Sequence, residues 1–329
     1  MGDRVSGGRG LAERRHNMLK GKRLQYGDTI GLIGPSGAVR TEGAVDRAIQ
    51  YMKDMGFSVK VGESAHAKYG YLSGTDEVRA RDLNAMFADP EVDAIVCTRG
   101  GYGTMRMLDL LDYDMIRKNP KVFVGFSDIT ALHIAFQERC GLVTFHGPMA
   151  TRWNDEFPDG FTKPAFLNAV MNAEPLGELH NAPGYHARET VNPGSAEGVL
   201  VGGNLSLIAG TIGTPYEINT KDRILFIEEI GERTYCVDRM LTQLRLAGKF
   251  NDCAGVVFGD FADCPVEYPE FGLTLEEIIR DVVAPCGKPI FTGLRCGHCT
   301  PKLTLPFGVK CRMDAEKCTL TVLESAVTE

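Results

Sequence analysis

The chain has 329 residues, of which 43% are hydrophobic and 24% are charged, so it can bury a sizeable core and is long enough for two domains. Its net charge of −7 and pI near 5.6 argue against a nucleic-acid surface, because phosphate binding relies on clustered lysine and arginine. The sequence lacks long apolar runs, so we expect neither a membrane span nor export, and we predict a cytoplasmic protein acting on a small molecule or peptide.

Residues 1–23 are polar, rich in glycine and arginine and without periodicity, which predicts a flexible basic tail. From residue 28 onward, short apolar runs alternate with helical patterns. The predicted strands lie in "TIGLIGPSG", "FSVKVG", "DAIVCTRGG", "KVFVGFS" and "GLVTFHGP", and the helices cover 42–55, 77–87, 104–111 and a segment from Asp128. This alternation predicts an N-terminal α/β domain over 24–151, with a parallel sheet and helices on both faces. Sites in such sheets form at the carboxyl ends of the strands.

Residues 152–195 are rich in proline, asparagine, glycine and aspartate, which predicts a linker or crossover. A second α/β domain is expected over 196–329. Its clearest elements are the strands "RILFIEEI" and "AGVVFGDF", and a helix that opens with the capping box Thr274 to Glu277. Between these strands an amphipathic helix places on one stripe Val237, Met240, Leu241 and Leu244. The chain closes with a predicted β-hairpin, "VKCRMD" and "CTLTVLE".

Ser127 stands in "VGFSDIT", where a predicted strand ends and a helix begins. A serine at a helix start is most often an N-cap, whose oxygen accepts hydrogen bonds from the free amides of the first turn. The same position also suits a nucleophile, because the turn exposes the hydroxyl and the helix amides stabilise an oxyanion. The stretch "GFSDI" departs from the GxSxG pattern, since Ile129 occupies its last glycine position.

Two glycine-rich loops also follow predicted strands, "GPSG" at 34–37 and "TRGGYG" at 98–103. Their glycines allow a ligand to approach the backbone closely, although either loop could equally be a plain turn. "GPSG" lacks both the lysine of a phosphate-binding loop and the GxGxxG spacing. Neither loop therefore predicts a nucleotide cofactor.

Four of the seven histidines bear on a catalytic base. His16 lies in the tail, and His133 follows Ser127 by six residues on a helix, so we expect neither to be a partner of Ser127. His146 follows a strand in "FHGP", and His298 stands in the loop "GHCTPKLTLPFG". A loop histidine is more often a surface or hydrogen-bonding residue than a catalyst, so the pattern leaves both roles open for His146 and His298.

Glu228 and Glu229 end the strand "RILFIEEI", whose two faces are both apolar. Carboxylates at the end of a buried strand need solvent or a partner. Side chains alternate along a strand, so Glu228 shares its face with Phe226 while Glu229 points to the opposite face. Only one of the two carboxylates can therefore face a given histidine.

The chain has ten cysteines, mostly in apolar segments, which indicates reduced buried thiols rather than a disulfide framework. They are Cys97, Cys140, Cys236, Cys253, Cys264, Cys286, Cys296, Cys299, Cys311 and Cys318. The pair in "CGHC" resembles a redox motif, but no helix pattern follows it to lower a thiol pKa. A zinc site from Cys296, Cys299, Cys311 and Cys318 is conceivable, although the second pair lacks the tight spacing of zinc knuckles.

Taken together, several stretches resemble the LD-carboxypeptidase family of serine peptidases, which also contains the microcin C immunity hydrolases. The matching stretches are "GDTIGLIGPSG", "YLSGTDEVRARDLNAMFADPEVDAIVCTRGGYG", "VGFSDITALHIAF", "HGPM", "GVLVGGNLSLIAGTIGTPY", "ILFIEEIGERTYCVDRMLTQL" and "GHCTPKLTLPFG". They follow the order of the family from about residue 25 to 310. One departure is the second cysteine of the pair around His298.

The resemblance implies a Ser-Glu-His triad on Ser127, Glu228 and His298, with the backbone amides of Gly101 and Asp128 as oxyanion donors. Ser127 would then serve as both helix cap and nucleophile. The resemblance also implies a nucleophile in the first domain, an acid and base in the second, no metal or organic cofactor, and a homodimer. The implied reaction is release of the terminal D-alanine from a cytoplasmic muropeptide tetrapeptide.

Two alternatives remain at this stage. Within the family, a microcin-type hydrolase would cut an acyl-sulfamoyl adenylate instead of a muropeptide. A protein of another class, a non-catalytic α/β protein that binds a small ligand, would bind without turnover.

Overall fold

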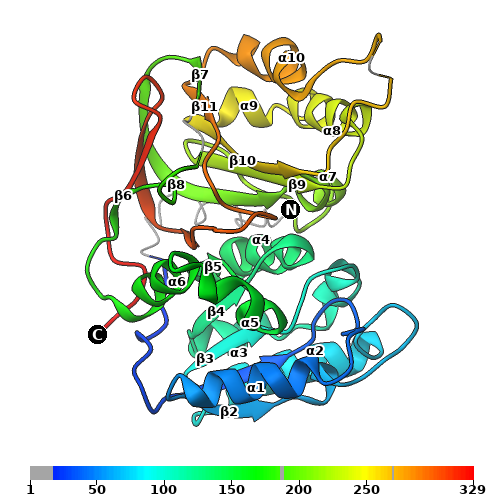
Figure 1. Ribbon diagram of the computed structural model, residues 1–329, viewed down its shortest axis with the longest axis vertical. Coiled ribbons are helices and arrows are strands. Elements are labelled where there is room, and N and C mark those ends of the chain that lie inside the picture. Colours follow the sequence, from blue (N-terminus) through cyan, green and yellow to red (C-terminus); the bar gives the residue numbers. More distant parts are fainter. Residues whose placement is uncertain (1–17, 186–188, 269) are drawn as a thin grey trace, which may run out of the picture.

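Two sheets organise the chain in the computed structural model, which describes residues 18–185, 189–268 and 270–329. Figure 1 shows the N-terminal domain, coloured blue to green, below the C-terminal domain, coloured mainly yellow-green to red. The prediction of a parallel-sheet domain followed by a second α/β domain with a C-terminal hairpin is confirmed.

The N-terminal sheet has six strands in the order β12-β5-β4-β3-β1-β2. Five are parallel and match the predicted apolar runs: β1 (Thr29–Ile33), β2 (Ser58–Val61), β3 (Ala94–Cys97), β4 (Val122–Gly125) and β5 (Thr144–His146). Every residue of β3 and β4 is buried, because helices cover both faces. The core on one face includes α1 (Ala44–Asp54), and the core on the other includes α2 (Asp76–Ala88), α3 (Tyr113–Lys118) and α4 (Thr130–Cys140).

The helix predicted over 104–111 is a 3-10 helix, Thr104–Leu110, followed by the separate helix α3. Asp112 causes the break, since its side chain accepts a hydrogen bond from the Met115 amide at 2.9 Å and so caps a new helix.

The sixth strand of the N-terminal sheet comes from the far end of the chain. β12 (Leu305–Phe307) pairs antiparallel with β5, with Leu305 opposite His146. The sequence pattern predicts only a loop here, because a three-residue strand containing proline carries no periodic signal. Since Leu305 meets the carboxyl end of β5, the segment just before it arrives at the edge of the sheet where sites form.

Residues 152–195, predicted to be a linker or crossover, connect the two sheets and contain elements of their own. They contain α5 (Trp153–Glu156), α6 (Thr162–Met171), β6 (Gly177–Leu179) and β7 (Glu189–Asn192). Trp153 stacks on Phe157 with ring centroids 4.9 Å apart, and Phe166 completes this aromatic cluster. β6 and β7 are the two edge strands of the second sheet. Three of these four elements, α5, β6 and β7, have only three or four residues, which explains their weak periodicity.

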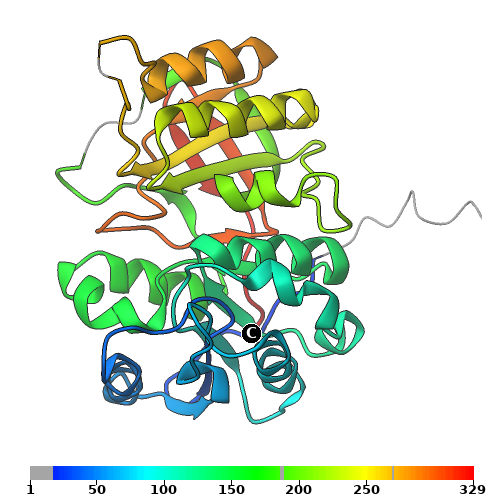
Figure 2. The same cartoon turned by 90° about the vertical axis from the view of Figure 1, so that its right-hand side faces the viewer.

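The C-terminal sheet has eight strands in the order β6-β14-β13-β8-β9-β10-β11-β7. Its parallel centre consists of β8 (Ser195–Asn204), β9 (Ile224–Ile230), β10 (Gly255–Ala262) and β11 (Ile290–Thr292). β13 (Lys310–Asp314) and β14 (Thr319–Val322) form the predicted hairpin. In Figure 2, helices lie in front of this sheet: α7 (Leu205–Thr211), α8 (Thr234–Leu246), α9 (Lys249–Asp252) and α10 (Leu275–Ile278). The predicted apolar stripe of α8 is buried, and the capping box at Thr274 is present.

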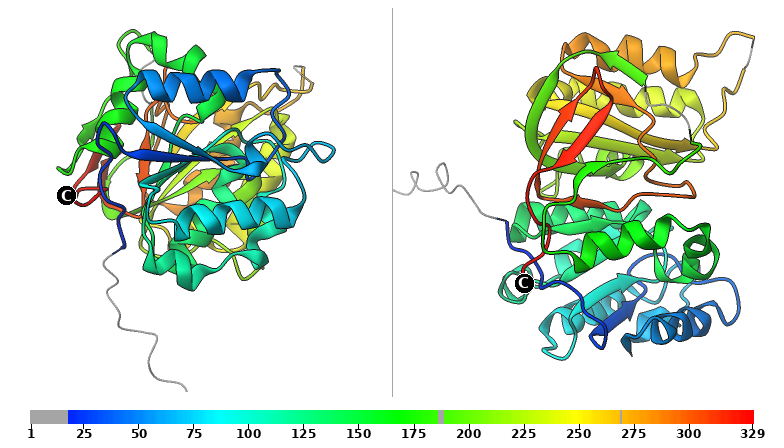
Figure 3. Two further views of the ribbon diagram at one scale, coloured as in Figure 1. Left: turned by 90° about the horizontal axis from the view of Figure 1, so that it is seen from below. Right: turned by 60° about the vertical axis from the view of Figure 1, so that its left-hand side comes forward.

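The two ends of the described chain lie together on the N-terminal domain (Figure 3). Residues 1–17 of the predicted tail lie outside the described residues. For residues 18–23 the prediction is wrong, because the Leu19 amide donates to the Gly141 carbonyl at 2.6 Å. The Thr328 amide likewise donates to the Gly21 carbonyl at 2.9 Å, so both ends are held by backbone pairing.

Candidate active site

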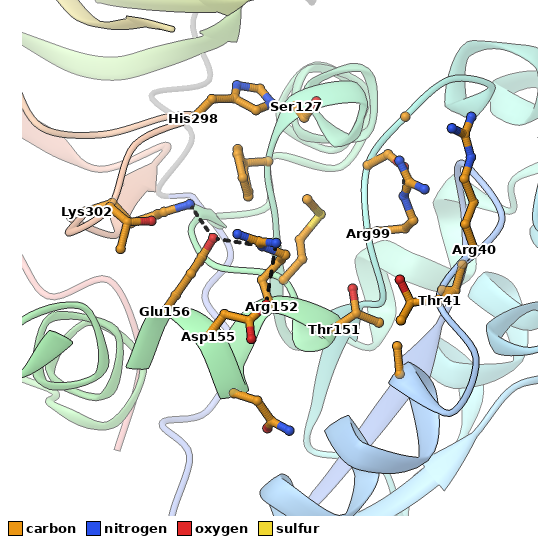
Figure 4. Close-up of a pocket in the computed structure, with 18 of the residues that line it drawn as sticks. Arg40, Thr41, Arg99, Ser127, Thr151, Arg152, Asp155, Glu156, His298 and Lys302 are labelled. Atoms are coloured by element: carbon orange, nitrogen blue, oxygen red, sulfur yellow. Dashed lines mark hydrogen bonds and ion pairs between the residues drawn. The ribbon is translucent and has the colours of Figure 1, made fainter. Parts of the chain in front are cut away.

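A pocket of about 600 Å³ opens where the carboxyl ends of β1, β3 and β4 meet the second domain. Ser127 and Gly101 line it from the first domain. His298 and Lys302 line it from the second domain, and Figure 4 shows them together with Ser127. The alternation of strands and helices predicted a site at this edge, and the pocket lies there.

Ser127 lies in the sharp turn between β4 and α4. Its φ is 65°, which makes it one of four described non-glycine residues with a left-handed backbone. A strained residue between a strand and a helix is the arrangement that presents a nucleophile above a sheet. The prediction that Ser127 also caps the helix is wrong: neither the 3-10 turn Ser127–Ile129 nor α4 has a side-chain cap. The physical reason is its backbone conformation, since an N-cap residue normally has an extended backbone.

Asp128, the next residue, joins three loops behind Ser127. Its side chain is buried, and its Oδ2 accepts hydrogen bonds from Ser36 Oγ at 2.6 Å and from the Thr104 amide at 2.9 Å. Thr104 Oγ1 in turn donates to the Asp128 carbonyl at 2.6 Å. The two glycine-rich loops are therefore held to the turn that carries Ser127, a role for "GPSG" that the sequence did not indicate.

Gly101 belongs to the loop that packs directly against Ser127. A Cβ built on the neighbouring Gly100 would lie 3.1 Å from Ser127 Oγ, so this loop has room only for glycine next to the hydroxyl. Gly101 itself has a φ of 128°, and within the described residues its amide donates no hydrogen bond. A free backbone donor thus lines the pocket beside Ser127.

His298 and Glu228 meet, although 70 residues separate them. His298 Nδ1 lies 2.7 Å from Glu228 Oε2, and the Glu228 side chain is fully buried while that of His298 is 15% exposed. The carboxylate accepts a hydrogen bond from Nδ1–H, which leaves Nε2 as the basic nitrogen. The close approach requires Gly297: with its φ of 113°, a Cβ there would lie 2.6 Å from Glu228 Oε2.

Glu229 points away from His298, as the strand alternation predicts. Its carboxylate accepts hydrogen bonds from Asn204 Nδ2 at 2.8 Å and from Ser206 Oγ at 2.7 Å. Burial raises the pKa of Glu229, while these hydrogen bonds oppose that rise. Glu229 therefore joins β9 to the start of α7 rather than serving the histidine.

The loop that carries His298 is anchored by Lys302, a residue that the sequence analysis did not single out. Lys302 is buried, and its Nζ donates to Glu156 Oε1 of α5 at 3.1 Å. The same Nζ lies 4.3 Å from the centre of the Phe126 ring, which packs against the His298 ring at 4.8 Å. A buried lysine needs a partner, but nothing local in the sequence names Glu156, which lies 146 residues away.

Ser127 and His298 lie side by side at the pocket in Figure 4. Across the described residues no hydrogen bond joins their side chains. In free enzymes catalytic hydrogen bonds are often long and tighten only when substrate binds.

The other histidines do not take part in this arrangement. His133 is buried under β4, where its Nε2 lies 2.9 Å from the Gly125 carbonyl, and burial lowers its pKa to about 4. His146 is also buried, and desolvation lowers its pKa well below the ordinary value. His16 falls outside the described residues.

The cysteines around His298 are buried free thiols. Burial raises the pKa of Cys299 to about 12 and that of Cys296 well above its usual range. Cys296 Sγ donates to the Leu303 carbonyl at 3.4 Å, which helps to close the His298 loop. Over the part of the chain that the structure describes, no three histidine, cysteine or acidic side chains are grouped to bind a metal ion. Within the same residues, no helix is long and apolar enough to cross a membrane.

The sequence of the chain matches a known protein family over both domains. Residues 30–147 match the description "LD-carboxypeptidase N-terminal domain" and residues 197–313 match "LD-carboxypeptidase C-terminal domain". The chain is 41% identical over 313 residues to the probable murein peptide carboxypeptidase of Bacillus subtilis, covering 94% of this chain and 96% of that one.

Two solved structures share the fold along nearly the whole chain. An inactive mutant of the microcin C7 self-immunity protein MccF, without ligand, superposes with a TM-score of 0.86 at 26% identity, covering 94% of this chain and 100% of that one. The muramoyltetrapeptide carboxypeptidase of Oxalobacter formigenes superposes with a TM-score of 0.79 at 28% identity, covering 92% and 100%. The chain therefore belongs to the LD-carboxypeptidase family, whose members are serine-type peptidase hydrolases.

Proposed function

We propose that Ser127, His298 and Glu228 form a catalytic triad, with the amides of Gly101 and Asp128 as oxyanion donors. The observation that carries this proposal is the 2.7 Å contact between His298 Nδ1 and buried Glu228, on a histidine that shares the pocket with Ser127. Family membership supports it and sets aside the alternative of a binding protein without turnover.

The chemistry follows from these positions. His298 Nε2 takes the proton of Ser127 as the hydroxyl attacks the scissile carbonyl, and Glu228 stabilises the imidazolium that forms. The tetrahedral oxyanion accepts hydrogen bonds from the backbone amides of Gly101 and Asp128. When the intermediate collapses, His298 gives the proton to the leaving amine. Water then attacks the acyl-enzyme by the same route, and Ser127 is regenerated.

We propose a muropeptide tetrapeptide as the substrate, cut between its L-centre, lysine or diaminopimelate, and the terminal D-alanine. The name of the relative from Bacillus subtilis, at 41% identity over nearly the full length, supports this choice. Cleavage of such peptides for cell-wall recycling would place the protein in the cytoplasm, where free cysteines are stable. The family resemblance supports a homodimer, which light scattering would test.

A second candidate is hydrolysis of an acyl-sulfamoyl adenylate, as in microcin immunity. The observation that favours it is the TM-score of 0.86 to the microcin C7 self-immunity protein, against 0.79 to the muramoyltetrapeptide carboxypeptidase. Sequence identity favours the first candidate, since 41% exceeds 26%.

One experiment separates the two candidates. The purified protein is incubated with tetrapeptides containing L-lysine or diaminopimelate, and with an aminoacyl-sulfamoyl adenosine, and the products are read by mass spectrometry. Loss of alanine from a tetrapeptide supports the first proposal. Cleavage of the adenylate alone would replace it with the second.

A further inference from the structure

The pocket is lined by five cationic side chains, and most of them already have partners. Lys302 pairs with Glu156 at 3.1 Å, and Arg152 pairs with Asp155 at 3.5 Å. Arg47 Nη1 donates to the Glu42 carbonyl at 3.1 Å. Among the residues that the structure describes, no carboxylate pairs with Arg40, Arg47 or Arg99. Of these three arginines, Arg40 and Arg99 lie next to each other on one wall of the pocket.

Arg99 is held with one end of its guanidinium fixed and the other end free. Its Nε donates to the Gly100 carbonyl and its Nη1 to the Ala38 carbonyl, both at 3.1 Å. Nη2 has no acceptor within the described chain. A Cβ built on Gly101 would lie 3.6 Å from this Nη2, so the free end lies beside the loop that packs against Ser127.

Arg40 lies next to Arg99 on the same wall of the pocket, as Figure 4 shows. It is exposed, and none of its contacts with the described residues is a hydrogen bond or ion pair. Burial lowers the pKa of Arg99, and the charge of Arg40 lowers it further, because the two cations repel each other. Two neighbouring guanidinium groups without a counter-charge are unfavourable unless an anion binds between them.

We propose that Arg40 and Arg99 bind a carboxylate group of the peptide substrate. Guanidinium groups suit this task because their planar donors match a carboxylate with two parallel hydrogen bonds. Two substrate carboxylates are candidates: that of the terminal D-alanine, and the side-chain carboxylate of diaminopimelate in the third position. The inference rests on the proposed function, since it assumes a peptide that is cut at Ser127.

The test compares three tetrapeptides. The first has lysine in the third position and a free terminal carboxylate, and the second is the same peptide with a terminal amide. The third has diaminopimelate in the third position and a free terminal carboxylate. We measure kcat/KM for the wild type and for Arg40→Gln, Arg99→Gln and Arg47→Gln. Arg47 is the matched control, an arginine of the same pocket that is turned to a backbone carbonyl. The comparison uses ratios of kcat/KM between substrates. Arg99 also donates to two loop carbonyls, and loss of these hydrogen bonds should lower the rate equally for every substrate.

We expect the wild type to prefer one carboxylate-bearing peptide over the matched peptide that lacks this carboxylate by about 10- to 100-fold. Arg40→Gln and Arg99→Gln should reduce that preference to near unity, while Arg47→Gln should keep it. If the two variants lose the preference for the free acid over the amide, the arginines bind the terminal carboxylate. If they lose the preference for diaminopimelate over lysine, the arginines bind the side-chain carboxylate of the third residue. Hydrolysis with unchanged ratios in both variants would overturn this inference alone. No hydrolysis of any peptide by the wild type would overturn the proposed function, and this inference with it.

Discussion

Ser127 and His298 reach the same pocket by different means. Ser127 is placed by its own backbone, at a left-handed turn between two elements that are adjacent in the chain. His298 stands in an irregular loop that is held from outside, by β12 pairing with β5 and by Lys302 pairing with Glu156. The first domain therefore supplies a rigid turn, whereas the second supplies a loop whose position depends on distant contacts.

This difference predicts where the site is sensitive to mutation. Around Ser127, substitutions should remove chemistry and leave the structure intact, because the turn is built by backbone and by the Asp128 hydrogen bonds. Around His298, substitutions should change rate and stability together, because the same contacts hold the loop and join the domains.

The largest effect is expected for Ser127→Ala. Loss of the nucleophile should lower kcat by about 10⁶, while stability changes little, because Ser127 makes no capping hydrogen bond that alanine would lose. Hydrolysis of a tetrapeptide and thermal unfolding measured on the same preparation check both parts. A folded variant with near-normal turnover would disprove the triad.

Glu228→Gln should have the next largest effect. The amide cannot hold the same histidine tautomer or stabilise its cation, and we expect kcat to fall by about 10⁴. Glu229→Gln is the matched control on the neighbouring residue, whose carboxylate accepts hydrogen bonds from Asn204 and Ser206 instead. It should keep most of the activity. The reverse order of kcat/KM in the two variants would mean that Glu229 is the functional acid.

The same contrast explains what could be predicted from the sequence. The site edge and the opposite directions of Glu228 and Glu229 follow from local signals: strands that alternate with helices, and side-chain alternation. The same signals place Ser127 at a strand-to-helix junction, where a helix cap is the usual interpretation, and only the family resemblance made it the predicted nucleophile. The β-strands of the first sheet are found for the same reason. His298 could be selected only through the family resemblance, because as a loop histidine it has no local pattern.

The elements that place His298 had no sequence signal at all. β12 is a three-residue strand that pairs across 159 residues, from Leu305 to His146. The partner of Lys302 lies in α5, inside a segment that was predicted to be a linker or crossover. The backbone of Ser127 was also missed, since a left-handed serine is uncommon and nothing in "GFSDI" requires it.

Gly297→Ala tests how closely the loop must approach β9. A Cβ at this position would lie 2.6 Å from Glu228 Oε2, so the loop must shift, and we expect kcat to fall by about 10²-fold. Gly27→Ala is the control, because this glycine also has a large positive φ, 99°, but no atom lies within 4 Å of the added methyl. Both variants carry the backbone strain, and only Gly297→Ala should lose activity. Equal activities of the two variants would show that the close approach of the His298 loop to Glu228 is not required for turnover.

Glu156→Gln should weaken the anchor of the His298 loop. It leaves Lys302 buried without its carboxylate, which we expect to cost about 3 kcal/mol of unfolding free energy and to lower kcat by roughly tenfold. The double variant Glu156→Gln with Lys302→Met removes the unpaired charge and should recover most of the stability. Denaturant unfolding of both variants measures this. An unchanged midpoint for Glu156→Gln would show that the buried pair does not hold the loop.

The smallest effect is expected at the two cysteines that flank His298. Their thiols are protonated at neutral pH, since burial raises the pKa of Cys299 to about 12 and that of Cys296 above its usual range. A protonated thiol is a poor nucleophile and a poor metal ligand. The Cys296 thiol acts instead as a donor to the Leu303 carbonyl, and a serine hydroxyl can replace it there. We therefore expect the double variant Cys296→Ser with Cys299→Ser to keep kcat/KM within a few-fold of the wild type. Treatment of the wild type with a chelator should likewise leave activity unchanged, and loss of activity in either experiment, with the protein still folded, would reveal a redox or metal function at this loop.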